Sequence, residues 1–379
     1  MRIVQITTDS REPYKTYDLP TPAFGAAPEA LLDGFKCLSN VEVHVVSCLR
    51  EPVASPSRIA PNIHYHSLVV PKTGWMTTAY QGCVRAVRGL LAEIQPDIVH
   101  GQGTERECAI SAVYSGFPNV ITIHGNMAEL QRLGLQGHLY FGLAASILET
   151  HALKRTAGVF CNSRYTRNLV APRAGHTWLV ANPIRSEFFQ PSTGVAKHSI
   201  PTLVNVGLVG ERKRQLELLG LVEEITNTGR SLQIVFAGSY SESTGYGSAF
   251  GAALRKGTGA GYARFAGFLE VPELLRLLDS SHGFLHFPAE ESFGLVVAEA
   301  MARGLKFFGA NLGGIVDIAA GIDGAELHDD FDTLKAGIIA WLDAGAPPPS
   351  LAADVIEERY HPAIIAKEHL RIYREVLEK

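Results

Sequence analysis

The sequence has no hydrophobic run long enough to cross a membrane. Its 379 residues contain no stretch that approaches the ~18 consecutive apolar residues of a transmembrane helix. The chain opens with Met1-Arg-Ile-Val-Gln-Ile, a pattern typical of a β-strand and not of a secretory signal peptide. We therefore expect a cytoplasmic protein.

Cysteine is scarce and scattered. The five cysteines are odd in number, and no two of them have the Cys-x-x-Cys spacing of a metal or redox site. This distribution excludes a disulfide framework and a zinc site built from cysteines. We expect all five to be reduced packing residues: Cys37, Cys48, Cys83, Cys108 and Cys161.

A strong charge of either sign is also missing. The formal net charge is −4, and residues 1–190 hold 17 Lys and Arg against 14 Asp and Glu, a balance of +3. The remaining residues hold 17 against 24, a balance of −7. Such values exclude the basic surface of a nucleic-acid-binding protein. The positive N-terminal half allows an approach to an anionic acceptor or to the inner face of a membrane.

Short apolar runs rich in β-branched residues alternate with longer helical patterns along the whole chain. This alternation is typical of parallel α/β sheets. Strands are predicted at residues 3–7, 41–47, 98–100, 120–124, 159–162 and 177–180, and then at 202–206, 233–237, 264–266, 283–287 and 306–309.

A chain of 379 residues suits two domains. The Pro-, Ser- and Gly-rich segment 182–201 predicts a linker between them, and a last helix is predicted over residues 364–377. The expected parts are an N-terminal domain over residues 1–185, a C-terminal domain over residues 186–358 and a terminal segment over residues 359–379.

The most informative stretch runs from Phe287 to Asp317. Pro288 ends an apolar run and cannot continue a β ladder, so the residues that follow it are predicted to form a loop. A helix is predicted over residues 296–303, with Gly304 as its left-handed end. The backbone N–H groups of Phe293–Leu295 would face a ligand at the helix N-terminus, and this arrangement favours a phosphate.

Two acids frame this predicted phosphate site. Glu291 lies in the loop and Glu299 lies two helical turns further on. Because like charges repel, these acids do not suit a bare phosphate and would instead accept hydrogen bonds from hydroxyl groups. A nucleotide sugar, with a diphosphate centre and hydroxyl-rich ends, meets both demands. The alternative is that Glu299 lies on a solvated helix face and Gly294 only makes a turn.

The run Glu291-Ser-Phe-Gly-Leu-Val-Val-Ala-Glu299-Ala-Met resembles the Glu-x7-Glu motif of family 4 retaining GT-B glycosyltransferases, as does the Gly-Gly-Ile-x-Asp that follows it. The resemblance implies two Rossmann-like, doubly wound domains that face a central cleft. The first domain would bind the acceptor and the second the donor, and the C-terminal helix within residues 359–379 would cross back to the first domain. It also implies that a sugar is transferred, with retained configuration, to a hydroxyl of a saccharide, lipid-linked or small-molecule acceptor. The expected donor is a UDP- or GDP-sugar, and no metal or other cofactor is expected.

Further residues take their predicted roles from the same resemblance. The segment from Gly207 resembles the Gly-Arg-x4-Lys step of the family, with Lys213 in register. Leu208 stands where the family has Arg, so Arg212 is expected to replace that cation beside the departing diphosphate. Predicted donor-binding positions are Gly25, Gly207, Gly267, Ser292, Phe293, Gly294, Leu295 and Glu299. Predicted catalytic positions are His124, Lys213, Arg212 and Glu291, with Glu291 holding the donor sugar.

Two histidines end predicted buried strands in the first half, His100 and His124. Open α/β sheets bind their ligands at the carboxyl ends of the strands, so a site role is expected for His124. A structural role is favoured for His100. Gly25 lies in a loop that leads into a predicted helix over residues 29–38, a geometry that suits phosphate, although Ala26 departs from the Gly-Gly of the family.

Several patterns are interpreted as structural. Asp330-Phe-Asp332 is expected to cap a helix and not to bind a metal. Ser163 is expected to be a helix cap, and the pairs His64/His66 and His282/His286 lack further clustered ligands and are assigned to strands or packing. The segments 75–91 and 130–153 are expected to pack as helices, with an acceptor groove or a membrane contact as the alternative.

Other functions on this fold remain open at this point. A nucleotide-sugar 2-epimerase, a sugar phosphorylase or a non-catalytic nucleotide-sugar-binding protein would use the same pocket. The sequence disfavours a dinucleotide dehydrogenase, because no Gly-x-Gly-x-x-Gly follows any predicted strand. No oligomeric state is predicted.

Overall fold

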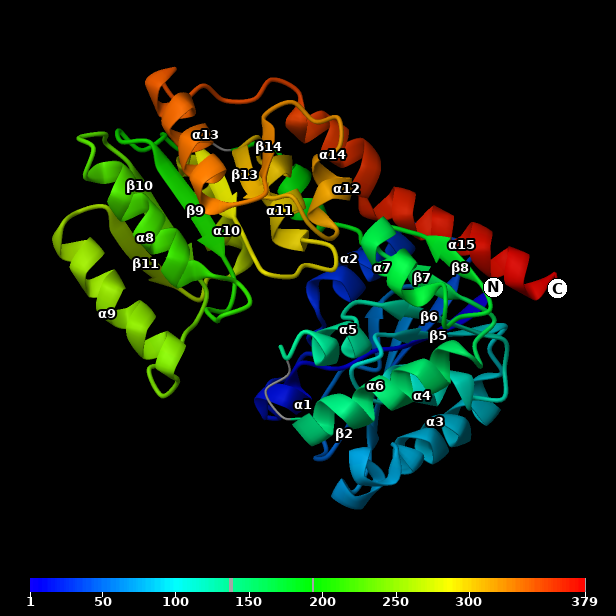
Figure 1. Cartoon of the computed structure of the whole chain (residues 1–379). Helices are drawn as coiled ribbons and strands as arrows, with labels where there is room; N and C mark the ends of the chain where they lie inside the picture. The colour runs from blue at the N-terminus through cyan, green and yellow to red at the C-terminus, as the bar shows by residue number, and fades with distance from the viewer. Residues whose placement is uncertain (136–138, 193, 379) are drawn as a thin grey trace. The chain divides into compact units, whose positions relative to one another are not determined.

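The chain divides into two compact units, each built on its own parallel sheet (Figure 1). The structure is a computed structural model and describes residues 1–135, 139–192 and 194–378. Unit 1 comprises Met1–Arg185 and Tyr360–Lys379, and unit 2 comprises Ser186–Arg359. The chain therefore leaves unit 1 after Arg185 and returns to it with its last helix.

Unit 1 has an eight-stranded sheet in the order β3-β4-β2-β1-β5-β6-β7-β8. All neighbouring strands are parallel except the edge pair β3 and β4. The strands are β1 (Arg2–Ile6), β2 (Glu42–Leu49), β3 (Arg58–Ala60), β4 (Ile63–Val69), β5 (Ile98–Gln102), β6 (Asn119–Ile123), β7 (Val159–Cys161) and β8 (Thr177–Leu179). The helices are α1 (Arg11–Tyr14), α2 (Ala26–Lys36), α3 (Gln81–Ile94), α4 (Glu107–Val113), α5 (Met127–Arg132), α6 (Leu139–Leu153), α7 (Arg164–Val170) and α15 (Pro362–Leu377).

The C-terminal helix α15 packs against α2 within unit 1. Its apolar residues recur at helical spacing, and Ile365, Leu370 and Tyr373 are buried on the packed face. Gly34 of α2 allows the close approach, because a Cβ there would lie 2.3 Å from the carbonyl oxygen of Pro362. A larger residue at Gly34 would force the two helices apart.

Unit 2 has a six-stranded parallel sheet in the order β11-β10-β9-β12-β13-β14. The strands are β9 (Thr202–Val206), β10 (Gln233–Ala237), β11 (Ala263–Gly267), β12 (Gly283–His286), β13 (Lys306–Ala310) and β14 (Ala325–His328). The helices are α8 (Gln215–Thr226), α9 (Gly245–Gly259), α10 (Val271–Ser280), α11 (Leu295–Ala302), α12 (Ile315–Ala319), α13 (Phe331–Asp343) and α14 (Ala352–Tyr360).

The predicted fold class is confirmed, since the sheets of both units are doubly wound and parallel apart from the β3–β4 edge pair. In each unit the strand order reverses at one point, between β1 and β5 in unit 1 and between β9 and β12 in unit 2. Loops diverge at such a point and leave a crevice at the carboxyl ends of the strands, where α/β proteins bind ligands. These two places are where a functional site is expected.

The prediction missed three strands, β3, β4 and β14. Polar or half-buried residues make up most of β4 and β14, so the apolar run that marks a buried strand is absent there. The long loop expected over residues 8–28 contains α1, and α2 begins at Ala26, earlier than predicted. Ser186–Phe189 forms a 3-10 turn in the predicted linker, whose residue 193 lies outside the described ranges.

Two expected local features are present, and one expectation about a cysteine is wrong. Gly304 has φ 71° after α11, as expected for a left-handed end. All five cysteines are free, but Cys37 is exposed and is therefore not a packing residue. Ser163 caps α7 by accepting from the backbone N–H of Thr166 at 3.1 Å, which confirms that prediction. In the described part of the chain, no helix is both long and apolar enough to cross a membrane.

Candidate functional site

The two predicted cations of unit 2 meet two acids at its strand-order reversal, the predicted Glu291 and its neighbour Glu290, which was not predicted. Arg212 and Lys213 lie in the loop between β9 and α8, and Glu290 and Glu291 lie in the loop between β12 and α11. The backbone N–H of Ala289 donates to the carbonyl oxygen of Arg212 at 2.8 Å and joins the two loops. Residues that are distant in sequence thus form one charged cluster.

Within this cluster each cation pairs with one acid. Arg212 Nη1 donates to Glu290 Oε2 at 3.1 Å, and Lys213 Nζ donates to Glu291 Oε2 at 2.5 Å. The same Glu291 oxygen lies 3.0 Å from Nε2 of His286, which is fully buried at the end of β12. His286 thus lies in a strand and is buried, as assigned from the sequence, and its contact with Glu291 also helps to fix that acid.

The surroundings of Glu291 keep it ionised. Burial alone would raise its pKa, but the Lys213 ammonium and the His286 hydrogen bond outweigh burial and hold the pKa well below its usual range. At Glu290 the balance is reversed. Burial outweighs the Arg212 guanidinium there and raises the pKa of Glu290. A carboxylate as strongly stabilised as Glu291 is a poor proton acceptor near neutral pH.

A second loop supports the backbone that leads into α11. The N–H of Gly314 donates to the carbonyl oxygen of Glu291 at 2.9 Å. A Cβ at Gly313 would lie 2.0 Å from that same oxygen, so only glycine permits this contact. Gly294, with φ 102°, caps the N-terminus of α11 and needs glycine for its backbone conformation. The predicted phosphate-binding backbone is thereby held in place.

Three further predicted positions lie around this helix. Ser292 is buried, and its hydroxyl donates to Glu290 Oε1 at 3.2 Å. Phe293 is buried beside it, while Leu295 is half-buried at the first turn of α11. Glu299 is only 3% exposed, so the alternative interpretation as a solvated helix face is wrong.

Glycines mark the carboxyl ends of the neighbouring strands β9, β10 and β11. Gly207 has φ 148° and Gly267 has φ 76°, both in the region that favours glycine. A Cβ at Gly238 would lie 2.1 Å from the carbonyl oxygen of Gly207. No described atom lies within 4 Å of where a Gly207 side chain would begin, so a ligand can approach this backbone. Phe268, next to Gly267, is 74% exposed.

In unit 1, His124 follows β6 and belongs to a buried chain of hydrogen bonds. Its Nε2 lies 3.0 Å from the Oε1 of Gln102, whose amide donates to Gln5 at 2.7 Å. Gln5 in turn donates to the hydroxyl of Tyr373 on α15 at 2.8 Å, and His100 Nδ1 lies 2.5 Å from that hydroxyl. His100 is fully buried, which supports the structural role favoured for it.

His124 is neutral in this setting. Burial lowers the pKa of His124 to about 4. Since the Gln102 amide nitrogen donates to Gln5, its oxygen is left to accept, so His124 carries its proton on Nε2. The other ring nitrogen, Nδ1, is then a hydrogen-bond acceptor and not a charged group.

Gly25 has a different character from the glycines of unit 2. It caps the N-terminus of α2 with φ −61°, a conformation open to any residue. A Cβ there would meet its nearest atom, Cδ of Pro28, at 3.7 Å, which is an ordinary contact. The position therefore lies at a helix N-terminus as predicted, but its backbone does not require glycine.

A charged cluster that the sequence analysis missed lies at the strand-order reversal of unit 1. Glu12, in the segment after β1, is fully buried at its side chain and pairs with Arg50 at 2.8 Å. The guanidinium carbons of Arg50 and Arg106 lie 4.7 and 5.2 Å from the ring centroid of Trp75. Glu107 is 1% exposed, and its Oε2 lies 3.5 Å from Nε of Arg106. The charged residues directly after β5 could have indicated this cluster from the sequence.

The two segments left open in unit 1 differ from each other. Trp75 and Tyr80 are buried, so packing is confirmed for the start of segment 75–91. In segment 130–153, residues 136–138 lie outside the described ranges, and α6 exposes large apolar side chains. These are Tyr140 at 88%, Phe141 at 42%, Leu143 at 51% and Ile147 at 60% exposure.

Comparison with known proteins identifies related families and folds. The family described as Glycosyltransferase Family 4 matches residues 38–187, and Glycosyl transferases group 1 matches residues 200–344. Among curated proteins, no relative matches the chain.

Solved structures resemble the chain over its whole length. Sucrose-phosphate synthase from Thermosynechococcus elongatus has a TM-score of 0.79 at 16% identity, covering 100% of this chain and 99% of that one. Anabaena HepE in complex with UDP-glucose has a TM-score of 0.69 at 15% identity, with 99% and 100% covered. The catalytic domain of starch synthase IV from Arabidopsis thaliana, bound to ADP and acarbose, has a TM-score of 0.69 at 12% identity, with 100% of both chains covered.

Proposed function

Because the chain belongs to the family 4, group 1 glycosyltransferases of the GT-B fold, we propose that it is a retaining enzyme that takes its sugar from a nucleotide diphosphate sugar. The acceptor is a hydroxyl group, and the transfer needs no metal ion. The observation that carries this proposal is the charged cluster of unit 2 at the strand-order reversal, directly beside the N-terminus of α11.

The cluster suits the departing diphosphate. An ammonium has three N–H donors, so Lys213 can keep its bond to Glu291 and still donate to a phosphate oxygen. Arg212 has five donors and uses one of its nitrogens for Glu290. The backbone at Phe293–Leu295 adds the positive end of the helix dipole. Each well-placed donor lowers the barrier by about 3 kcal/mol.

The acids of the motif suit the hydroxyl groups of the donor. Glu299 would accept from the ribose hydroxyls, and Glu291 from the sugar. His124, with an acceptor nitrogen at Nδ1, is assigned to a substrate hydroxyl on the same grounds. The strongly lowered pKa of Glu291 speaks against its acting as the base, so the charge of Glu291 serves binding.

Without a protein base, the leaving group takes the proton. The bond between the anomeric carbon and the diphosphate oxygen breaks while the acceptor oxygen bonds to the same face of that carbon. The acceptor proton moves to the released phosphate oxygen, and the products are an α-configured glycoside and a nucleoside diphosphate. Reaction on one face retains the configuration, and Lys213 and Arg212 offset the charge that develops on the phosphate.

Metal independence is proposed because the acids available for a metal at the donor site are already engaged. Glu290 and Glu291 pair with cations. Asp330, the first residue of the Asp-x-Asp pattern, accepts from the backbone N–H of Thr333 at 2.7 Å and caps α13. Cations in place of a metal ion then supply the charge that a diphosphate requires.

The donor is proposed to be a UDP- or GDP-sugar. Anabaena HepE, which shares the fold, is described in complex with UDP-glucose, and this supports a uridine nucleotide. The exposed ring of Phe268 at the end of β11 provides a flat apolar surface on which a base can stack.

The acceptor is assigned to unit 1, as a saccharide, a lipid-linked or a small-molecule acceptor. The cluster of Glu12, Arg50 and Arg106 lies at the reversal point of that sheet and combines anion-binding and hydroxyl-binding groups. The exposed apolar residues of α6 favour a lipid-linked acceptor that is reached at the cytoplasmic face of a membrane. Replacement of Leu143 and Ile147 by Ser should then abolish sedimentation with anionic vesicles and leave nucleotide binding unchanged.

Nucleotide binding tests the donor site directly. The wild type, Glu299→Ala and the control Glu224→Ala, which removes a surface acid of the same unit, are heated with UDP, GDP, ADP, CDP or dTDP. A nucleotide at ~100 times its dissociation constant adds about 2.7 kcal/mol of stability. One nucleotide should raise the melting temperature of the wild type and of Glu224→Ala but not that of Glu299→Ala.

Other outcomes would change the proposal. If Glu299→Ala keeps both nucleotide affinity and rate, the assignment of the pocket is wrong. Turnover of the donor sugar without any acceptor would indicate an epimerase, and a requirement for phosphate would indicate a phosphorylase. Nucleotide-sugar binding without sugar transfer to any tested acceptor would indicate a non-catalytic binding protein.

A further inference from the structure

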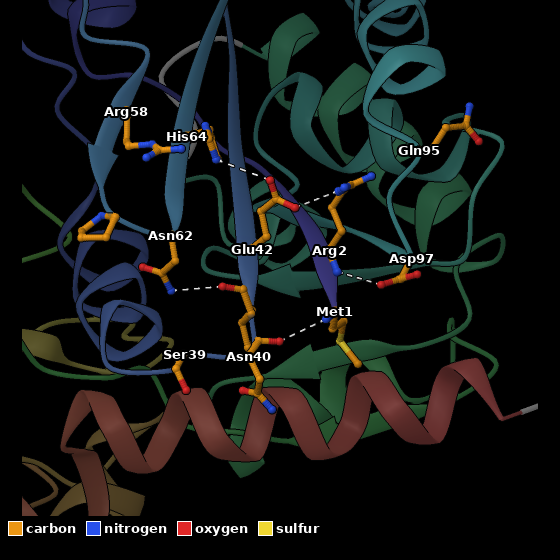
Figure 2. A pocket seen from close by; sticks show the side chains of 12 residues that line it. Met1, Arg2, Ser39, Asn40, Glu42, Arg58, Asn62, His64, Gln95 and Asp97 are labelled. Carbon is orange, nitrogen blue, oxygen red and sulfur yellow. Dashed lines mark hydrogen bonds and ion pairs between the residues drawn. The ribbon is translucent and has the colours of Figure 1, made fainter.

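A cluster of histidines and one glutamate lies at the β2–β4 side of the unit 1 sheet, away from the loops described above. Glu42 and His44 alternate on β2, and His64 and His66 alternate on β4, so period-two spacing puts each pair on one face of its strand. The parallel register sets His44 directly opposite His64. Figure 2 shows Glu42 and His64 from the two strands turned toward each other.

The donor atoms have the spacing of a metal site. Glu42 Oε1 lies 3.4 Å from His44 Nε2 and 3.5 Å from His64 Nε2. All three atoms lie within 4.8 Å of one another. Ligands at about 2.0–2.1 Å from a tetrahedral zinc ion are separated by about 3.3–3.4 Å along each edge. Two of the three distances between donor atoms, 3.4 and 3.5 Å, are therefore already close to those between the ligands of a zinc ion.

His44 is arranged as a ligand and not as a hydrogen-bonded core residue. It is 9% exposed, and within the described ranges its Nε2 has no hydrogen-bond partner. Its other nitrogen, Nδ1, lies 3.0 Å from Nε2 of His66. If Nδ1 carries the proton and donates to His66, Nε2 presents a lone pair toward Glu42. Metal-binding histidines are oriented by such an outer hydrogen bond.

The surroundings leave room for a further ligand. Glu42 uses its other oxygen, Oε2, to accept from Arg2 at 3.0 Å, so Oε1 remains for a metal. A pocket of about 710 Å³ opens beside Glu42 and His64, and Arg58, Asn62 and Asp97 line it as well (Figure 2). Water or a small ligand can reach a bound ion from this side.

We propose that Glu42, His44 and His64 bind one divalent transition-metal ion of the zinc class, with His66 positioning His44. Two imidazoles and a carboxylate suit Zn²⁺, whereas Mg²⁺ and Ca²⁺ prefer oxygen ligands alone. The ion would join β2 to β4 near the edge of the sheet. His64 and His66 lie in β4, which agrees with their assignment to a strand, but the sequence analysis missed Glu42 and His44 as clustered neighbours of His64. The proposed site is independent of the transfer reaction.

Direct metal binding tests this site. The full chain, free of any affinity tag and treated with a chelator, is titrated with Zn²⁺ against a chromophoric competitor, and with Co²⁺ by visible absorption. The wild type should bind one ion per chain and give the intense bands of tetrahedral Co²⁺. His64→Gln and Glu42→Gln should weaken Zn²⁺ binding at least tenfold. His66→Leu, which removes the acceptor of the His44 Nδ1 proton, should weaken it by about 10–100-fold, as removal of an outer hydrogen bond does elsewhere.

A matched control separates this site from adventitious binding. His176→Gln removes an exposed imidazole of the same unit and should leave stoichiometry and affinity unchanged. Zn²⁺ should also raise the melting temperature of the wild type and of His176→Gln, but not that of His64→Gln. Equal Zn²⁺ affinity in the wild type and His64→Gln, with circular dichroism showing that both are folded, would overturn the proposal.

Discussion

The two units place polar groups along their sheets but stabilise them differently. In unit 1, Gln102 and Tyr373 belong to a chain of hydrogen bonds between neutral groups that leads to His124. In unit 2, Lys213 and Glu291 form an ion pair. A neutral buried network mainly defines shape, whereas an ion pair can rearrange around an anionic ligand. We therefore assign a scaffold role to the part of the unit 1 network that supports His124, and diphosphate binding to the unit 2 cluster.

Acidification should give the largest difference between the units. Burial lowers the pKa of His124 and His369 to about 4, from 6.5, and that of His100 well below 6.5. As the pH falls, these histidines take up protons in the unfolded chain before they do so in the folded chain. The stability of unit 1 should therefore fall as the pH drops from 6.5 toward 4. Each histidine contributes up to about 1.4 kcal/mol per pH unit.

Unit 2 should lose less stability over the same pH range, although burial also lowers the pKa of its histidines His198, His282, His286 and His328. Among its described residues only His286 is a fully buried histidine. The lowered pKa of Glu291 stabilises the folded state above the ordinary carboxyl range, and this contribution is lost only as the pH falls below about 4.3. Urea unfolding of Trp341→Phe measures how the unfolding free energy of unit 1 changes with pH, because the two remaining tryptophans, Trp75 and Trp178, both lie in unit 1. His369→Leu should reduce this slope by about 1.4 kcal/mol per pH unit. An unchanged slope would contradict the role given to the buried histidines.

Removal of the cation in unit 2 should have the largest effect on catalysis. Lys213→Ala takes away one donor to the diphosphate and leaves the Glu291 carboxylate uncompensated beside it. The turnover number should fall by about 10²–10³-fold, measured as nucleoside diphosphate release at saturating donor. Lys306→Ala, which breaks the ion pair with Glu326 between β13 and β14, is the matched control. A Lys213→Ala rate close to that of the control would count against the diphosphate role.

The neutral network of unit 1 should respond to a single missing hydroxyl. Tyr373→Phe leaves Gln5 and His100 without their buried partner, which should cost about 1–3 kcal/mol of unfolding free energy. Tyr14→Phe, at a tyrosine that is 77% exposed, should have almost no effect in the same denaturation experiment. Equal midpoints for the two variants would mean that the network does not hold α15.

The smallest expected effect is a difference in stability between two glycine substitutions, one in each unit. Gly207→Ala places a side chain on a backbone with φ 148° and should destabilise the chain by about 1–3 kcal/mol. Gly25→Ala, at φ −61° with space around it, should change stability by less than about 0.5 kcal/mol. Melting curves of the two variants give this comparison, and a larger loss at Gly25 would reverse it.

Much of the fold could be predicted from the sequence because the signals are local. The apolar runs of β9 and β10 coincide with the predicted ranges, and Asp330 and Ser163 cap the helices that follow them. In contrast, β4 was missed, since alternating His64, Tyr65 and His66 do not form an apolar run. Strand β14 was missed for a similar reason, because all its residues are only partly buried.

The doubly wound fold class and the spacing of Glu291 and Glu299 can be predicted from the amino-acid sequence, because strand patterns and helix positions depend on neighbouring residues. The pairing of the charged and polar groups depends instead on the folded sheets. Lys213 meets Glu291 across 78 residues, and His44 meets His64 across two strands joined in register. Such contacts depend on strand order and register, which are properties of the whole sheet and leave no local pattern in the chain.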